Sequence, residues 1–390
     1  MTLSVVAESE VVTRLVGRHV GRKPGPKLLV TTLMHGNEPA GRDAASRVLA
    51  RLSQGDVDLS GELVVLVGNT RASQSHVRFV DKDLNRQFTP ERVDHLRRSS
   101  PSQRMESEDI DAWELLQVLD EELRPGEEGA YFLDLHTTSA PGIPFVLFGD
   151  TLRNRKWAES IPLTKILGLE EQLDGTLLEH IGSTGWVTLG CEGGQHDDPV
   201  AVDNLEAVLW LAMVGAGMIP EDAHDLGPSR RRLESARSGR PPIIEVRYRH
   251  PITPRDQFRM RPGFTSLDPV DTGTLLAMDV EGEIRARWDG WLLMPLYQGQ
   301  GSDGFFLASQ VKPFWLELSA VLRRLRLDTL LRILPGVSAH PDRPATLVVD
   351  TKVARIFPLE IFHLFGYRKL RSQGHVLLVS RRLHDLTPPW

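Results

Sequence analysis

Short apolar runs alternate along the first half of the chain with segments whose apolar residues recur at helical spacing. The apolar runs have the length and the β-branched composition of buried strands, and they cover residues 28–33, 62–67, 130–136, 145–148 and 185–194. The helical segments cover residues 40–52, 110–123 and 201–214. Strands that alternate with helices predict an α/β domain built on a largely parallel or mixed sheet. We assign this domain to residues 1–228, and short alternating runs over residues 2–20 predict peripheral strands at its start.

The pattern changes twice after this domain. Residues 228–242, with three consecutive arginines and a Ser-Gly-Arg-Pro-Pro run, indicate a domain linker. Residues 243–311 contain short alternating runs broken by Gly and Asp, a pattern typical of a small all-β domain. Residues 312–390 combine helical and strand periods and predict a C-terminal α+β segment. Its expected helices cover residues 314–334 and 353–365, and its expected strands cover residues 346–349 and 375–380.

Two segments of the first domain show little periodicity. Residues 70–88, which contain Arg78, Asn85 and Arg86, are best explained as a functional loop, because long stretches without a period usually bind ligands or are disordered. Residues 89–108 are polar and contain Pro and Ser, which predicts a mobile surface excursion.

Composition narrows the class of protein. A chain of 390 residues with 41% hydrophobic and 25% charged residues is typical of a soluble globular protein with two or three domains. The net charge of −6 gives no reason to expect nucleic acid or an anionic membrane as partner. The single cysteine excludes an intrachain disulfide, and the most apolar run, residues 207–219, is too short to span a bilayer. The N-terminus lacks the basic and apolar segments of a signal peptide, so we expect a cytoplasmic protein. The sequence is compatible with a homo-oligomer.

Charge is unevenly distributed along the chain. Residues 313–390 contain twelve Lys and Arg against six Asp and Glu, so this segment is basic and the rest of the chain is acidic. Such a segment favours contact with acidic partners or anionic ligands, and a solvated face or a subunit contact is an equally good interpretation.

Polar residues with catalytic potential follow three of the predicted strands. His35 and Glu38 come after the first strand, His136 ends the strand at 130–136, and Glu192 lies near the end of the strand at 185–194. In α/β sheets the carboxyl ends of strands form the ligand-binding edge. Two imidazoles and a carboxylate form the three-ligand set of catalytic zinc, and a further carboxylate can take a proton from water. Taken singly, each of these residues is better explained as a strand-end polar group satisfied by loop backbone.

Four short motifs reduce that ambiguity because they occur together in a family-specific order: His35-Gly36-Asn37-Glu38, Asp83-Leu84-Asn85-Arg86, Asp134-Leu135-His136 and the glycine-flanked Glu192. Over about residues 28–215 the chain resembles the succinylglutamate desuccinylase and aspartoacylase family, zinc amidohydrolases related to the zinc carboxypeptidases. The resemblance implies a zinc-carboxypeptidase-like mixed sheet flanked by helices and an enzyme that hydrolyses the amide of a small N-acyl amino acid or related carboxylate.

The same resemblance assigns roles to individual residues. His35, Glu38 and His136 match the ligands of one Zn²⁺ per chain, and Glu192 matches the general base. Arg78 matches the arginine that polarises the scissile carbonyl, and the pair that holds the substrate carboxylate is Asn85 and Arg86. Asp134 lies two residues before His136 and shares its strand face, so it is expected either to orient the imidazole or to be a structural carboxylate.

The chain departs from the family pattern around the general base. A Gly-Pro continuation does not follow Glu192, and no arginine lies between Arg155 and Glu192, so a second arginine clamp for a substrate carboxylate is missing from the sequence. A substrate other than N-acetylaspartate or succinylglutamate is implied. Residues 243–307 resemble the small β domain of the family, from which Tyr297 is a candidate to face the site, whereas residues 313–390 resemble nothing in it.

Two other functions stay open: a carboxypeptidase-like metallopeptidase and a non-catalytic zinc- or ligand-binding module. Residues 299–304 fit G-x-G-x-x-G, but the run precedes an apolar stretch in a β-rich region, which argues against a dinucleotide site. Cys191 is expected to pack in the core, and residues 196–198 to form a solvated loop.

Overall fold

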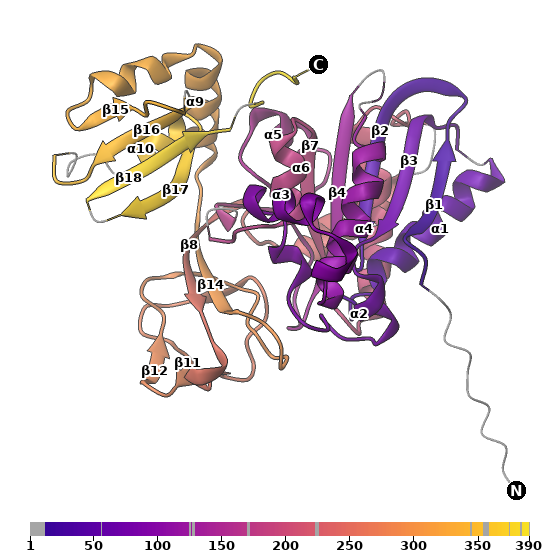
Figure 1. Cartoon of the computed structure of the whole chain (residues 1–390), viewed down its shortest axis with the longest axis horizontal. Coiled ribbons are helices and arrows are strands. Elements are labelled where there is room, and N and C mark those ends of the chain that lie inside the picture. Colours follow the sequence, from indigo (N-terminus) through magenta and orange to yellow (C-terminus); the bar gives the residue numbers. More distant parts are fainter. Residues whose placement is uncertain are drawn as a thin grey trace, which may run out of the picture.

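A single mixed sheet of eleven strands runs through the computed structural model, in the order β1-β3-β2-β4-β7-β5-β6-β8-β14-β13-β10 (Figure 1). The structure describes residues 12–389 except 56, 125, 127–128, 170–171, 223–225, 344, 354–358, 374 and 383; the side chains of 359–360 and 369–373 also lie outside the description. The strands in sheet order are β1 Leu15–Val20, β3 Ser60–Val67, β2 Lys23–Thr32, β4 Ala130–Thr138, β7 Val187–Gln195, β5 Phe145–Leu147, β6 Thr164–Leu167, β8 Ile243–Pro251, β14 Asp303–Gln310, β13 Gly290–Leu293 and β10 Asp268–Val270. The expectation of strands over residues 2–20 is confirmed for β1, and its first part lies outside the described residues.

The centre of the sheet is parallel. β2 pairs in parallel with β3 and β4, and β4 pairs in parallel with β7. The carboxyl ends of β2, β4 and β7 therefore meet at one edge, as the sequence predicts, and the α/β fold class is confirmed.

Helices cover both faces of this sheet, because alternate strand residues point to opposite sides. On β2, Leu28 and Val30 pack in one core with α1 (Ala40–Gln54), α5 (Leu152–Ala158) and α7 (Pro199–Gly215). Leu29 packs in the other core with α3 (Pro90–Arg98), α4 (Ser107–Glu122) and α6 (Leu177–Ser183).

The expected surface excursion at 89–108 is wrong for its first part, which is the packed helix α3, followed by the 3₁₀ turn η2 (Pro101–Gln103). Thr89 caps α3 by accepting a hydrogen bond from the Arg92 backbone N–H, and Pro90 occupies the first turn. Val93 and Leu96 are buried three residues apart on one face. The preceding segment, 70–88, contains only α2 (Thr70–Gln74) and the 3₁₀ turn η1 (Leu84–Arg86).

The expected linker at 228–242 is also wrong for most of its length, since Gly227–Arg237 form helix α8. Leu226 and Leu233 are both buried, and their spacing of two helical turns places them on the face that packs against α7. The arginine run of this helix lies on the solvent side, which explains why its sequence is so polar.

The β region after residue 243 extends the main sheet. β8 pairs in parallel with β6 and antiparallel with β14, which continues into β13 and β10. A separate three-stranded sheet contains β12 (Gly282–Arg285), β11 (Leu275–Asp279) and β9 (Arg259–Met260), and η4 (Pro254–Asp256) precedes it. The division of the chain at 228, 243 and 312 remains a prediction.

The C-terminal segment is α+β, as expected, and Figure 1 shows it as a lobe beside the main sheet. It begins with α9 (Pro313–Arg324) and η5 (Leu327–Ile333) and contains α10 (Leu359–Leu364). Its antiparallel sheet has the order β15 (Val337–Ala339), β16 (Thr346–Asp350), β18 (Val376–Arg381), β17 (Tyr367–Gln373). The sequence did not predict β17, because this strand has few apolar residues. Part of the helix expected at 353–365 lies outside the described residues.

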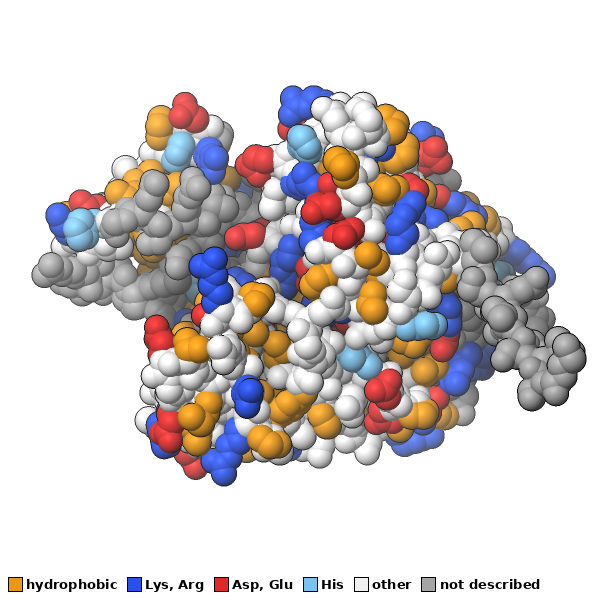
Figure 2. All heavy atoms as spheres, turned by 60° about the horizontal axis from the view of Figure 1, so that its bottom comes forward, with side chains coloured by type: hydrophobic (Ala, Val, Ile, Leu, Met, Phe, Trp, Pro, Cys, Tyr) orange, Lys and Arg blue, Asp and Glu red, His pale blue; other side chains and the backbone are white. Residues whose placement is uncertain are grey.

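The described surface shows neither a membrane span nor a broad patch of one charge on the face in view. None of the described helices has the length and hydropathy needed to cross a bilayer. On the face shown in Figure 2, the described basic and acidic side chains are intermingled with scattered hydrophobic ones.

Candidate active site

The corner between β2 and α1 is tightly constrained. Leu33 adopts a left-handed backbone with φ 53°, which turns the chain out of the sheet ahead of His35. A Cβ on Gly36 would lie 2.1 Å from the Ala72 carbonyl carbon, so only glycine fits beside α2. The Gly36 N–H donates to the Arg78 carbonyl at 3.2 Å, which joins the corner to the 70–88 segment.

The three predicted metal ligands converge at this corner. Their nearest ligand atoms all lie within 4.8 Å of one another, and the three residues are buried. His35 Nδ1 lies 2.7 Å from Glu38 Oε1, and His136 Nδ1 lies 3.0 Å from Glu38 Oε2. This group could hold a metal ion, since imidazole nitrogens and carboxylate oxygens are ordinary ligands.

The outward nitrogens of both imidazoles contact carboxylates. His35 Nε2 lies 3.2 Å from Asp83 Oδ1, and His136 Nε2 lies 3.0 Å from Asp134 Oδ2. The expected contact between Asp134 and His136 is thus present. Asp83 had no role in the sequence analysis, although it begins one of the four motifs. Carboxylates in these positions fix the ring orientation of metal-binding histidines.

Charged neighbours shift the pKa values of Glu38, His136 and Asp83. Burial alone would raise the pKa of Glu38, but His35 and His136 outweigh it and hold that pKa well below its usual range. Burial would lower the pKa of His136, and the carboxylates of Asp134 and Glu38 instead hold it well above its ordinary value. The pKa of Asp83 is likewise well below its usual range, because His35 and Arg78 outweigh its burial.

Glu192 lies beside this cluster with different electrostatics. Its Cα pairs in register with that of His136 across β4 and β7. Burial raises the pKa of Glu192 to about 7; the charge of Glu38 adds to this, while His136, His35 and Arg78 oppose it. Among the described residues, none donates a hydrogen bond to Glu192 Oε2. A carboxyl group with a pKa near the working pH suits proton transfer in both directions.

Arg78 is held by the same acidic residues. Its Nη2 lies 3.0 Å from Asp83 Oδ2, and its Nη1 lies 3.7 Å from Glu38 Oε1. Burial would lower the pKa of Arg78, but Asp83 and Glu38 raise it above its ordinary value, so the guanidinium stays charged.

Asn85 and Arg86 belong to the 3₁₀ turn η1, which follows Asp83. Asn85 Oδ1 accepts a hydrogen bond from the Leu177 N–H at 2.9 Å, and Arg86 Nη1 donates to the Asn85 carbonyl at 2.8 Å. Arg86 Nη2 also pairs with Asp303 Oδ2 at 3.1 Å, and the other oxygen of Asp303 accepts from Arg249 Nε. Sequence reasoning missed Asp303, because it lies 217 residues beyond Arg86 and belongs to no motif.

All seven residues singled out from the sequence line one pocket of about 150 Å³, and their roles remain predictions. The first half of the chain contributes Leu147, Phe148 and Gly149 to the wall, and the segment between β13 and β14 contributes Met294, Leu296, Gln298, Gly301 and Ser302. Tyr297 does not line this pocket; its hydroxyl contacts the Arg261 and Phe264 backbone instead. The G-x-G-x-x-G run at 299–304 is followed by strand β14. A dinucleotide-binding site would need a helix at this position.

Two neighbours of Glu192 were also interpreted from the sequence. Cys191 is fully buried, as expected, in the core that packs against α1, α5 and α7. His196 is half-buried, and its Nδ1 lies 2.8 Å from Thr137 Oγ1, so the expected solvated loop holds only for the exposed Asp197 and Asp198.

Known proteins of one enzyme family are similar to this chain in sequence and in fold. The family model for the succinylglutamate desuccinylase/aspartoacylase catalytic domain matches residues 24–167. A succinylglutamate desuccinylase from Erwinia tasmaniensis is 32% identical over 112 residues, which is 28% of this chain and 32% of that protein. One from Pseudomonas paraeruginosa is 34% identical over 67 residues, 17% of this chain and 20% of that protein. The matched stretches thus span a third or less of these relatives.

Solved structures share the fold over a larger part of the chain. A succinylglutamate desuccinylase/aspartoacylase from Rhodobacter sphaeroides has a TM-score of 0.55 at 21% identity, covering 75% of this chain and 87% of that one. Murine aminoacylase 3 has a TM-score of 0.51 at 17% identity, covering 74% of this chain and 97% of that one. These structures show that the chain has the fold of the succinylglutamate desuccinylases and aspartoacylases, and the family model matches its first part, residues 24–167.

Proposed function

We propose that this protein is a zinc-dependent hydrolase that cleaves the amide bond of a small N-acyl amino acid or related carboxylate. The observation that carries the proposal is the convergence of His35, Glu38 and His136 beside Glu192 in one pocket. Relatives named succinylglutamate desuccinylase and aminoacylase support the same reaction class. A small-molecule partner and a cytoplasmic location, without nucleic acid or membrane, belong to this proposal.

The donor set fits one zinc ion per chain. Two imidazoles and a carboxylate are a common catalytic ligand set, and the outer nitrogens of both rings contact Asp83 and Asp134, as is usual for zinc-bound histidines. When bound, zinc lowers the pKa of water to about 7 and polarises a carbonyl oxygen.

Glu192 is the proton carrier in this proposal. Its pKa of about 7 lets it take a proton from the attacking water and later deliver that proton to the leaving amine nitrogen. Its Oε2 accepts no hydrogen bond from the described residues, so one oxygen is available for that exchange.

Arg78 supplies fixed positive charge for the oxyanion that develops on the scissile carbonyl. Asp83 holds its guanidinium in place before substrate arrives, so little reorganisation is needed in the transition state. Loss of one such donor typically costs roughly 3–4 kcal/mol of transition-state stabilisation.

Asn85 and Arg86 are proposed to bind the substrate carboxylate. The guanidinium of Arg86 can make two parallel hydrogen bonds to a carboxylate. In this structure one of its nitrogens, Nη2, pairs with Asp303. Among the described residues that line the pocket, the arginines are Arg78 and Arg86. This supports a substrate with one carboxylate at Arg86, other than N-acetylaspartate or succinylglutamate.

Metal analysis followed by a hydrolysis screen tests the proposal. The purified protein should contain about one zinc per chain, and hydrolysis should be fastest with short N-acyl amino acids. Turnover that increases as the acyl group is lengthened into a peptide would favour a carboxypeptidase-like metallopeptidase instead. A protein that binds zinc but hydrolyses none of these compounds would favour a non-catalytic binding module.

A further inference from the structure

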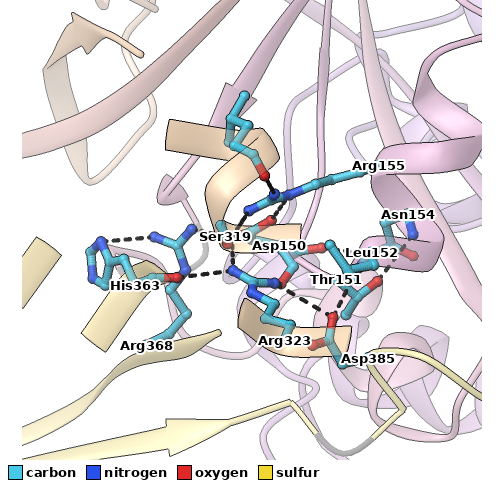
Figure 3. A network of polar contacts seen from close by, with 12 residues as sticks. Asp150, Thr151, Leu152, Asn154, Arg155, Ser319, Arg323, His363, Arg368 and Asp385 are labelled. Atoms are coloured by element: carbon cyan, nitrogen blue, oxygen red, sulfur yellow. Dashed lines mark hydrogen bonds and ion pairs between the residues drawn. The ribbon is translucent and has the colours of Figure 1, made fainter. Parts of the chain in front are cut away.

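The C-terminal segment contacts the catalytic domain directly behind the pocket. Leu147, Phe148 and Gly149 line the pocket, and the next residue, Asp150, is only 1% exposed. Figure 3 shows that the side chain of Asp150 lies at the centre of a network of polar contacts between the catalytic domain and the C-terminal segment.

Three guanidinium groups surround the Asp150 carboxylate. Arg155 belongs to α5 of the same domain, and its Nε lies 2.5 Å from Asp150 Oδ1. Arg323 from α9 and Arg368 from β17 lie 2.6 and 2.5 Å from Asp150 Oδ2 (Figure 3). Arg323 has no exposed side-chain surface, and its Nη1 also donates to the Asp150 carbonyl at 3.1 Å. The C-terminal segment therefore binds both the side chain and the backbone of this residue.

Two further carboxylates complete the network. Asp385 Oδ1 accepts a hydrogen bond from the Leu152 N–H at 2.8 Å, at the start of α5, and lies 3.5 Å from Arg323 Nη1. Glu245 on β8 accepts from Arg368 Nη1 at 2.7 Å. Arg368 thus connects the loop after β5 to β8.

The end of the chain returns to the same region, and Figure 1 shows it passing from β18 toward α5. A Cβ on Gly149 would lie 2.5 Å from Arg382 Cζ, and a Cβ on Gly185 would lie 2.4 Å from Pro389 Cδ. Gly185 comes just before β7, the strand that carries Glu192. The tail is therefore packed against two segments that lead into the pocket.

We propose that residues 312–390 are part of the catalytic unit, and that Arg323 and Arg368 are positioning residues that hold the 147–149 wall of the pocket through Asp150. The effect on catalysis rests on the proposed function; the effect on the wall does not. The basic charge of this segment, read from the sequence as a possible surface for acidic partners, is in part used within the chain, on Asp150 and Glu245.

The structure argues for positioning rather than stability alone. Arg323→Met removes one of three cations from Asp150, and Arg155 and Arg368 still pair with the carboxylate, so the variant keeps a charge-compensated interface. It also loses the hydrogen bonds from α9 to the Asp150 carbonyl, to Asp385 and to the His363 carbonyl. The loop after β5 should then move more freely while the rest of the domain stays folded.

The experiment compares Arg323→Met, Arg368→Met and Arg323→Lys with Arg324→Met, an exposed neighbour on the same helix. Hydrogen exchange of the 145–158 peptide should become faster in both Met variants and stay unchanged in Arg324→Met. With an N-acyl amino acid as substrate, KM should rise about 10-fold in the Met variants with little change in kcat, and Arg323→Lys should recover part of the loss.

The two proposals fail separately. If the wild type hydrolyses no N-acyl amino acid while exchange of the 145–158 peptide responds as described, the proposed function is wrong and the positioning role stands. If folded Arg323→Met and Arg368→Met match Arg324→Met in exchange and in KM, the positioning role is overturned. Should Arg323→Met not fold, Arg368→Met and Arg323→Lys decide the question by the same two readouts.

Discussion

His136 and Glu192 lie directly opposite each other on neighbouring parallel strands, with their Cα atoms paired in register between β4 and β7. Backbone hydrogen bonds of the sheet therefore fix the distance between the Cα atoms of a proposed metal ligand and the proposed general base. Such a site is positioned by rigid strands rather than by loops alone, which favours reproducible geometry for proton transfer.

Glu192→Gln should remove hydrolysis and leave zinc binding intact. The amide cannot accept a proton from water, and general-base catalysis is typically worth 10²- to 10⁴-fold in rate, so kcat should fall by about that factor. Steady-state kinetics and zinc content measured on the same sample check this. Glu234→Gln, an exposed change on α8, is the control. Retention of full activity by Glu192→Gln would contradict the assigned role.

Asp83→Asn should weaken zinc binding by about 10- to 100-fold, because the partner of the outer nitrogen of His35 loses its charge. Competition with a chromophoric chelator measures the zinc Kd. Asp94→Asn, on the exposed side of α3, should leave the zinc Kd unchanged. Equal affinities in the two variants would show that Asp83 does not support the metal site.

Asp303→Asn should lower KM for the carboxylate substrate by about 3- to 10-fold, because the substrate no longer competes with an internal carboxylate for Arg86. Arg86 keeps its contact with the Asn85 carbonyl, so it should stay in place. Glu281→Gln, an exposed change in the same β region, serves as control. A higher KM in Asp303→Asn would instead mean that Asp303 positions Arg86 for the substrate.

Acid should weaken the attachment of the C-terminal segment. Burial alone would raise the pKa of Glu245, but His363 and Arg368 outweigh it and lower that pKa from 4.5 to about 2. A carboxylate with a lowered folded pKa stabilises the protein above its unfolded pKa, and this contribution is lost as the pH falls from about 4.5 through about 2. The linked free energy of unfolding is on the order of 3 kcal/mol.

Urea unfolding of the wild type and Glu245→Gln at several pH values tests this linkage. The variant should be less stable at pH 7, and the difference should shrink steadily as the pH is lowered below about 4.5. A difference that does not depend on pH would assign the effect of the substitution to packing rather than to the charge of Glu245.

The central site could be predicted because it follows from local patterns. Apolar runs identify β2, β4 and β7, and parallel strands end at a common edge, so His35, His136 and Glu192 had to approach one another. Helices α3 and α8 were not predicted because their composition is as polar as that of a loop or linker. The Thr89-Pro90 start and the seven-residue spacing of Leu226 and Leu233 were available in the sequence.

Contacts between distant segments left no signal of this kind. The pairing of Arg86 with Asp303 and of Asp150 with Arg323 joins residues 217 and 173 positions apart, and neither pair has a periodic or compositional signature. The parallel pairing of β6 with β8 could not be predicted from the sequence either. Which strand pairs with which depends on the topology of the whole chain rather than on the residues of one strand.

The backbone ladder that joins β6, β8 and β14 bears on how a substrate enters. The segment 294–302 covers the pocket and is anchored to the first domain, where Asn37 donates to Gln298 at 3.3 Å and Gln300 donates to the Phe79 carbonyl at 3.3 Å. The strands that flank this segment belong to the same eleven-stranded sheet as the rest of the site. A hinge motion that separated the two parts of the pocket would therefore have to break hydrogen bonds of the sheet. If the pocket opens for a ligand, we therefore expect the opening to come from local movement of residues 294–302 rather than from a hinge between domains.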